Sequence, residues 1–80
     1  MKYNLIDTLS EKQVIVCKLD AYFMASHACN KHTSNLNEVL LFPCNKDGMV
    51  VDWFHEDAFK YASIEEFIGN ECAIDDDYDD

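Results

Sequence analysis

Arginine is missing from this sequence of 80 residues, which also holds only two glycines and one proline. Without arginine, the chain lacks the planar fork that binds phosphate and carboxylate groups in a bidentate manner. So few glycines and prolines indicate short turns within one compact unit. No apolar run approaches the roughly 18 residues of a membrane span, and no charged-then-apolar segment follows Met1. We therefore expect a cytoplasmic protein that binds no membrane.

Acidic residues dominate one part of the chain. Residues 1–51 carry five acids and five lysines, whereas residues 52–80 carry eleven acids and one lysine, so the second segment holds the whole net charge of −10. This charge repels nucleic acid, whose binding depends on basic groups that meet phosphate. If charge drives recognition, the partner is a protein with a basic surface.

Composition predicts one domain over residues 1–74 and a flexible acidic tail over 75–80, where like charges repel one another. Hydrophobic residues make up 49% of the chain, which is ordinary for a globular protein. The four cysteines do not follow the dense spacing of a disulfide framework, so we expect reduced, mostly buried thiols.

Two strands are expected first, at residues 2–6 and at the β-branched segment 13–19, and they can pair as a hairpin. Residues 20–29 leave two alternatives open. Either Asp20 caps a short second helix, or the strand continues through Phe23, because short apolar runs fit both states.

Residues 38–53 carry the clearest hairpin pattern. Strands are expected at 38–42 and 49–53, joined by a turn at 45–48 in which Gly48 adopts a positive φ. In this hairpin Trp53 faces the core. Pro43 has no N–H, which indicates that its strand lies at an edge or is bulged.

Ser63 and Glu66 form the pattern of a capping box, which predicts a helix from about Ser63 to Glu71 or Cys72. Ile64, Phe67 and Ile68 then share one apolar face. The expected fold is α+β: a three- or four-stranded antiparallel sheet, with this C-terminal helix packed on one face.

Residues 39–72 resemble a group of short, uncharacterised tailed-phage proteins. The shared pattern is an apolar hairpin with a Leu-Phe step, here Leu41-Phe42, followed by a basic-Tyr-x-Ser-x-Glu-Glu helix start, here Lys60-Tyr61-Ala62-Ser63-Ile64-Glu65-Glu66. This chain departs from the pattern at Ala62, where a hydroxyl is common, and at Gly69-Asn70, which replaces a later Gly-His. The resemblance implies a phage or mobile-element origin and no activity.

Chemistry-bearing side chains offer one minor alternative, a zinc site. The side chains are His27, Cys29, His32 and Cys44, which are ligand types that zinc accepts. The paired Cys-x-x-Cys spacing of a zinc ribbon is absent, so we expect no metal and no cofactor. No cysteine has both an adjacent base and an orienting third group, so we expect no enzyme.

Aromatic rings alternate with carboxylates from Asp52 onward, which is typical of a surface that binds a basic protein. The predicted partner-binding residues are Asp52, Trp53, Phe54, Glu56, Asp57, Glu65, Glu66 and Glu71. The leading hypothesis is a monomeric or homodimeric phage protein that inhibits or modulates a host protein, such as a nucleic-acid-handling defence complex. The alternatives are a self-associating assembly module and the small zinc protein.

Overall fold

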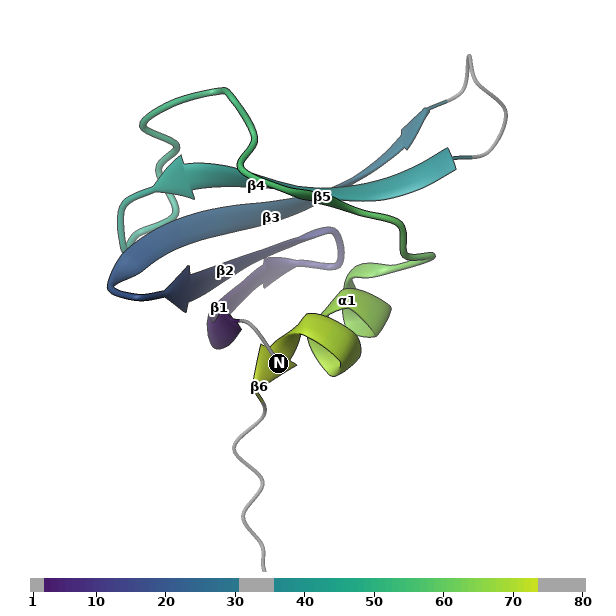
Figure 1. The fold of residues 1–80 in the computed structure, drawn as a ribbon, viewed down its shortest axis with the longest axis horizontal. Coiled ribbons are helices and arrows are strands. Elements are labelled where there is room, and N and C mark those ends of the chain that lie inside the picture. The colour runs from purple at the N-terminus through teal and green to yellow at the C-terminus, as the bar shows by residue number, and fades with distance from the viewer. Residues whose placement is uncertain (1–2, 31–35, 74–80) are drawn as a thin grey trace, which may run out of the picture.

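A curled, six-stranded mixed sheet forms a half-barrel, and one short helix lies beside it (Figure 1). The computed structural model describes residues 3–30 and 36–73. The predicted tail at 75–80 therefore lies outside the described residues. The sheet order is β5-β4-β3-β2-β1-β6. The elements are β1 (Tyr3–Ser10), β2 (Gln13–Lys18), β3 (Ala21–Asn30), β4 (Leu36–Cys44), β5 (Ala58–Phe59), α1 (Ile64–Glu71) and β6 (Cys72–Ala73).

The expected three- or four-stranded antiparallel sheet with a helix on one face is therefore wrong. Two strands of only two residues extend the sheet at its edges, and β6 pairs with β1 in parallel, Tyr3 with Cys72. The strand β1 is also longer than expected. Its register with β2 shifts between Leu5 and Asp7 and again between Thr8 and Ser10. Such bulges bend a strand and increase its twist, which explains the curl.

Residues 21–30 form β3, so the helix proposed for 20–29 is wrong. Lys18 pairs with Ala21, and the two residues between them adopt positive φ angles of 53° at Leu19 and 67° at Asp20. A two-residue turn of this shape joins antiparallel strands with the correct twist. Asp20 therefore closes a hairpin and caps no helix.

The turn predicted at 45–48 is present, and Gly48 has a φ of 87°. The returning strand is wrong beyond Val50, which makes an isolated bridge to Cys44. Pro43 explains the break: its carbonyl accepts the N–H of Val51 at 2.9 Å, but proline has no N–H to give in return. Pairing with β4 resumes only at Leu41, whose carbonyl accepts the Glu56 N–H.

The helix was correctly predicted, including its capping box. The Ser63 hydroxyl accepts the Glu66 N–H at 3.2 Å, while the Glu66 carboxylate accepts the Ala62 N–H at 3.0 Å. The apolar side chains of α1 join strand residues in one buried cluster. This cluster contains Tyr3, Val14, Val16, Ala25, Val39, Leu41, Ile64, Phe67 and Cys72.

A smaller buried cluster lies on the opposite face of the sheet. It consists of Ile15, Met24 and Cys44 and is packed against by Val50 from the residues after β4. Val14, Ile15 and Val16 alternate between the two clusters because neighbouring side chains of a strand point to opposite faces. Both faces of β2 are thus buried, which accounts for its continuous β-branched run.

Candidate functional site

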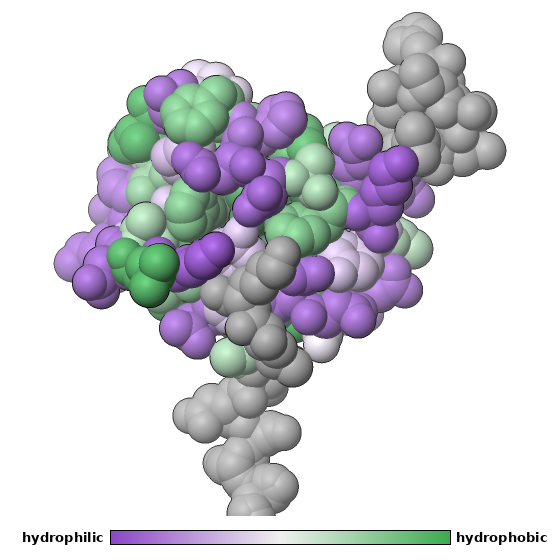
Figure 2. Space-filling model, viewed as in Figure 1, coloured by the Kyte–Doolittle hydropathy of each residue, from purple (hydrophilic) through white to green (hydrophobic). Residues whose placement is uncertain are grey.

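The β4–β5 loop, residues 45–57, exposes large apolar side chains. Trp53 is 72% exposed and Phe54 51% exposed, and Met49 and Val51 are also exposed. Figure 2 shows hydrophobic groups (green) beside hydrophilic ones (purple) at the upper left, where the β4–β5 loop lies. The expectation that Trp53 faces the core is wrong, because strand alternation is lost after Val50.

Local contacts nevertheless hold the aromatic part of this loop in place. The Trp53 ring packs edge-on against Phe42, with 5.5 Å between ring centroids, and the His55 ring also packs edge-on with Phe42, at 6.3 Å between centroids. The Asp52 carboxylate accepts the Phe54 N–H at 3.3 Å. The loop therefore presents exposed rings on a supported backbone beside an acidic side chain.

A second feature lies where β1 begins and α1 ends. The Tyr3 side chain is buried in the cluster that contains the α1 residues. Its hydroxyl donates to the Asp57 carboxylate at 2.9 Å. Burial raises the pKa of Tyr3 most, followed by the hydrogen bond to Asp57 and by the charges of Asp57, Glu71 and Glu56. One carboxylate, Asp57, thus accepts this hydroxyl, and the charges of Glu71 and Glu56 act on it without a hydrogen bond.

Tyr61 extends this group. Its hydroxyl donates to the Glu71 carboxylate, and this hydrogen bond is the main reason that the pKa of Tyr61 rises to about 12, with a smaller contribution from the charge of Glu66. We call Glu56, Asp57, Glu66 and Glu71 the acidic strip. The only described lysine with a contact here is Lys18, whose ammonium lies 5.4 Å from the centroid of the Tyr3 ring.

The structure thus brings four of the six predicted acids together and leaves two apart. Asp52 lies in the β4–β5 loop beside Trp53. Glu65 lies in the first turn of α1, where it lines a cavity. The predicted residues therefore form an acidic strip, an aromatic loop and one further position, and not a single uniform patch.

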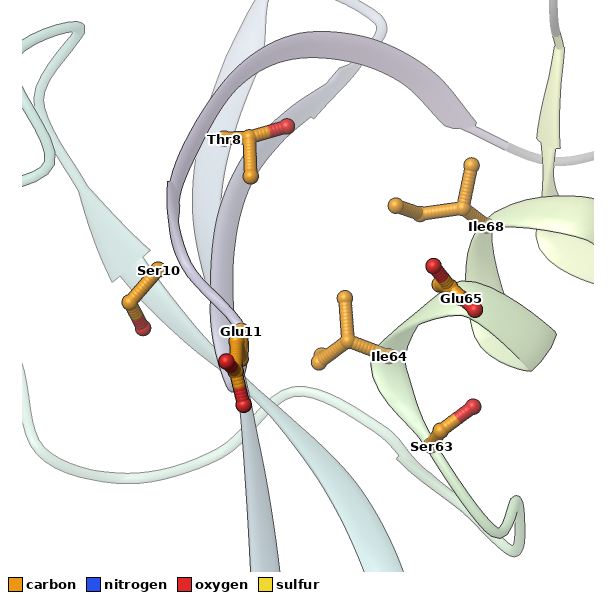
Figure 3. Close-up of a pocket in the computed structure, with 7 residues that line it drawn as sticks. All are labelled: Thr8, Ser10, Glu11, Ser63, Ile64, Glu65 and Ile68. Atoms are coloured by element: carbon orange, nitrogen blue, oxygen red, sulfur yellow. The ribbon is translucent and has the colours of Figure 1, made fainter.

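That cavity opens between the β1–β2 hairpin and the start of α1, and its volume is about 660 Å³ (Figure 3). Its lining combines hydroxyl, carboxylate and aliphatic groups from Thr8, Ser10, Glu11, Ser63, Ile64, Glu65 and Ile68. Sequence reasoning missed Glu11, because residues 1–51 are balanced in charge. The available signal was its place at the hairpin turn after β1, which follows from the pairing of Ser10 with Gln13.

The proposed zinc ligands are not brought together. His27 pairs with Val39 and faces the helix-side cluster, whereas Cys44 belongs to the cluster on the opposite face. Cys29 is part of β3, and His32 lies outside the described residues. Within residues 3–30 and 36–73, no three metal-ligating side chains converge. The Nε2 atom of His27 is buried there without a hydrogen-bond partner.

The described thiols are free, and two of them are buried. Burial raises the pKa of Cys44, and burial together with the charge of Glu71 raises that of Cys72 to about 11. Thiols with raised pKa values are protonated at neutral pH and are therefore weak nucleophiles.

In comparison with known proteins, no family model, curated protein or solved structure matches the chain significantly. Over the described residues, no helix is long and apolar enough to cross a membrane. The phage resemblance of residues 39–72 stays a prediction.

Proposed function

We propose that this chain is a non-catalytic protein that binds a basic surface of another protein through its acidic strip and its β4–β5 loop. The observation that carries the proposal is that Asp57 and Glu71 accept the hydroxyls of Tyr3 and Tyr61, while the charges of Glu56 and Glu66 act on the same two hydroxyls. Among the described residues, none of the four forms an ion pair with a lysine or histidine. A partner that supplies lysine or arginine would neutralise them.

The β4–β5 loop supplies the anchors that such an interface needs. Most binding energy in protein interfaces comes from a few residues, and tryptophan is prominent among them. Trp53 and Phe54 are exposed on a supported backbone next to Asp52. The acidic strip would then speed association with the partner, and the rings of Trp53 and Phe54 would supply most of the binding energy.

In its finer form, the proposal is that the partner is a host protein that handles nucleic acid, such as a defence complex, and that this phage or mobile-element chain inhibits or modulates it by partly mimicking nucleic-acid charge. The net charge of −10, the absence of arginine and the phage resemblance support this form. The separation of Glu65 and Asp52 from the strip argues that mimicry involves the strip alone.

Salt and matched variants test the contribution of charge. The partner is first isolated from host lysate by affinity capture and identified by mass spectrometry. Its affinity should fall steeply between about 50 and 500 mM NaCl, because screening shortens to a few ångströms. The E56Q/E71Q variant should bind about tenfold more weakly, since each exposed pair contributes up to about 1 kcal/mol. D20N/E38Q loses the same number of charges at positions outside the acidic strip and the β4–β5 loop and should bind as the wild type does.

The aromatic anchor is tested separately. W53S should lower affinity by at least about tenfold, whereas M49S in the same loop should have a small effect, because tryptophan is the stronger hot-spot residue. A salt-independent complex that W53S weakens would reject charge mimicry and leave the aromatic interface standing. Full binding by both W53S and E56Q/E71Q would reject the proposal.

Self-association is a second candidate, because the same loop exposes Met49, Val51, Trp53 and Phe54. Contiguous exposed apolar groups often mark an interface. Light scattering distinguishes the two functions: a stable oligomer at micromolar concentration that W53S disperses would favour an assembly module over a host-protein binder.

A further inference from the structure

The cavity between the β1–β2 hairpin and α1 combines an apolar floor with an acidic rim. Figure 3 shows Ile64 and Ile68 extending from the helix toward the hairpin, with Glu11 on the hairpin side and Glu65 on the helix side. The two carboxylates thus come from different elements, and their juxtaposition is a product of the fold. The volume of about 660 Å³ lies within the range of roughly 300–1,000 Å³ that ligand sites occupy.

Neither carboxylate has a partner in the part of the chain that the structure describes. Across the described residues, Glu11 and Glu65 have no hydrogen bond or ion pair, and no lysine or histidine lines the cavity. Glu66 differs from them, because its carboxylate accepts the Ala62 N–H at the helix start. The rim therefore carries two free negative charges.

We propose that this cavity receives the cationic side chain of an arginine or lysine from the partner protein. This inference rests on the proposed function and adds a second point of contact to it. Arginine and lysine bury an aliphatic stem along apolar surface while the charged head stays at the rim. Ile64 and Ile68 suit the stem, and Glu11 and Glu65 suit the head. The hydroxyls of Thr8, Ser10 and Ser63 add acceptors for its N–H groups.

The competing occupants fit less well. An anion is repelled by both glutamates, and an uncharged apolar segment would bury them without a counter-charge, which is unfavourable. The start of a helix carries about half a positive charge, which opposes a cation. Two full negative charges at the rim outweigh it, so the field in the cavity favours a cation.

Binding is tested with a hexa-arginine peptide as the probe and its neutral citrulline counterpart as the control. Hexa-arginine should bind the wild type, and E11Q/E65Q should weaken it about tenfold. The D20N/E38Q variant has the same net charge as E11Q/E65Q, and neither of its residues lines the cavity, so it should retain wild-type affinity. An equal loss in both double variants, or equal binding of the citrulline peptide, would show that only overall charge matters and would overturn the inference.

Location is tested in the unmodified protein, which removes any dependence on how the variants fold. The methyl signals of Ile64 and Ile68 should shift on addition of hexa-arginine in a methyl NMR spectrum, whereas that of Ile6, on β1, should not. Shifts confined to residues outside the cavity would overturn the proposal. So would spermidine binding with equal affinity at the same methyls, because the site would then serve free polyamines.

The isolated partner separates the two proposals. If E56Q/E71Q weakens the complex and E11Q/E65Q does not, the cavity proposal fails alone. If E11Q/E65Q weakens it while E56Q/E71Q and W53S do not, the acidic strip and loop proposal fails and the cavity remains.

Discussion

At the scale of single residues, Tyr3 connects the most distant parts of the chain. Its hydroxyl joins β1 to Asp57, 54 positions away, and its ring meets Phe23 and Phe59 edge-on at 6.1 and 6.3 Å between centroids. The residue therefore links β1 to β3, to β5 and to the end of the β4–β5 loop. The hydrogen bond also ties the acidic strip to the core, so the fold holds the Asp57 carboxylate in place.

Tyr3 also makes the fold sensitive to alkaline pH. The pKa values of Tyr3, Tyr61 and Cys72 are raised in the folded state, so the fold binds these protons more tightly than the unfolded chain does. Their contribution to the free energy of unfolding is complete below the ordinary pKa values, 9.0 for cysteine and 10.0 for tyrosine. It is lost as the pH rises through the raised pKa values of the folded state. Urea midpoints should thus fall above about pH 9.

The Y3F variant isolates the largest of these contributions. It should lose about 1 kcal/mol at neutral pH, the worth of one hydrogen bond, and should decline less steeply in alkali. Y22F is the control, because the Tyr22 hydroxyl makes no hydrogen bond among the described residues. A Y3F decline as steep as that of the wild type would contradict this account.

Gly48 is required by its surroundings, whereas Gly69 is not. An added Cβ at Gly48 would lie 3.1 Å from Ile15 Cδ1 and 3.2 Å from Leu9 Cδ1, on a backbone with φ of 87°, but at Gly69 it would meet nothing within 4 Å. G48A should therefore destabilise the fold by about 1–3 kcal/mol. G69A should stabilise α1 by up to about 1 kcal/mol. Urea denaturation of both variants checks the opposite signs.

At the scale of elements, the helix start and the Gly48 turn could be predicted from the sequence, whereas the pairing of the strands could not. Ser63 and Glu66 predicted the helix, and Gly48 predicted its turn, because each acts on residues a few positions away. The turn at Leu19 and Asp20 carries neither glycine nor asparagine, so nothing marked the start of β3. The full length of β1 could not be predicted, because its bulges interrupt the alternation of apolar and polar residues by which strands are recognised.

The β2–β3 turn contains backbone strain at Leu19 that a substitution could relieve. Leu19 has a positive φ of 53° and is 89% exposed, so its side chain offers little packing in return. L19N should stabilise the protein by about 1 kcal/mol, because asparagine tolerates this conformation far better than leucine. L19A removes the same side chain but keeps the strain, and it should bring no such gain. Equal urea midpoints for the two variants would show that the leucine side chain, and not the backbone angle, decides stability.

At the scale of the whole molecule, the sheet depends on partners that no local pattern identifies. The strands β5 and β6 have two residues each, and they form only because β4 and β1 offer free edges to them. The candidate surfaces follow the same rule. The charges of Glu56 and Glu71 both act on the Tyr3 hydroxyl, and Glu11 and Glu65 line the same cavity. From the sequence alone, acidic residues could be compared only by their positions along the chain.

Net charge should give salt two effects of opposite sign. In the isolated protein, the charge of −10 repels itself and destabilises the compact state. Raising NaCl from about 0.01 to about 0.1 M shortens the Debye length from roughly 30 to 10 Å, so the urea midpoint should rise. The same change should weaken the complex with a basic partner, because there the charges attract. A fold whose stability falls with salt over this range would mean that attractive pairs outweigh repulsion, and the acidic strip would then be compensated within the chain and not free to bind.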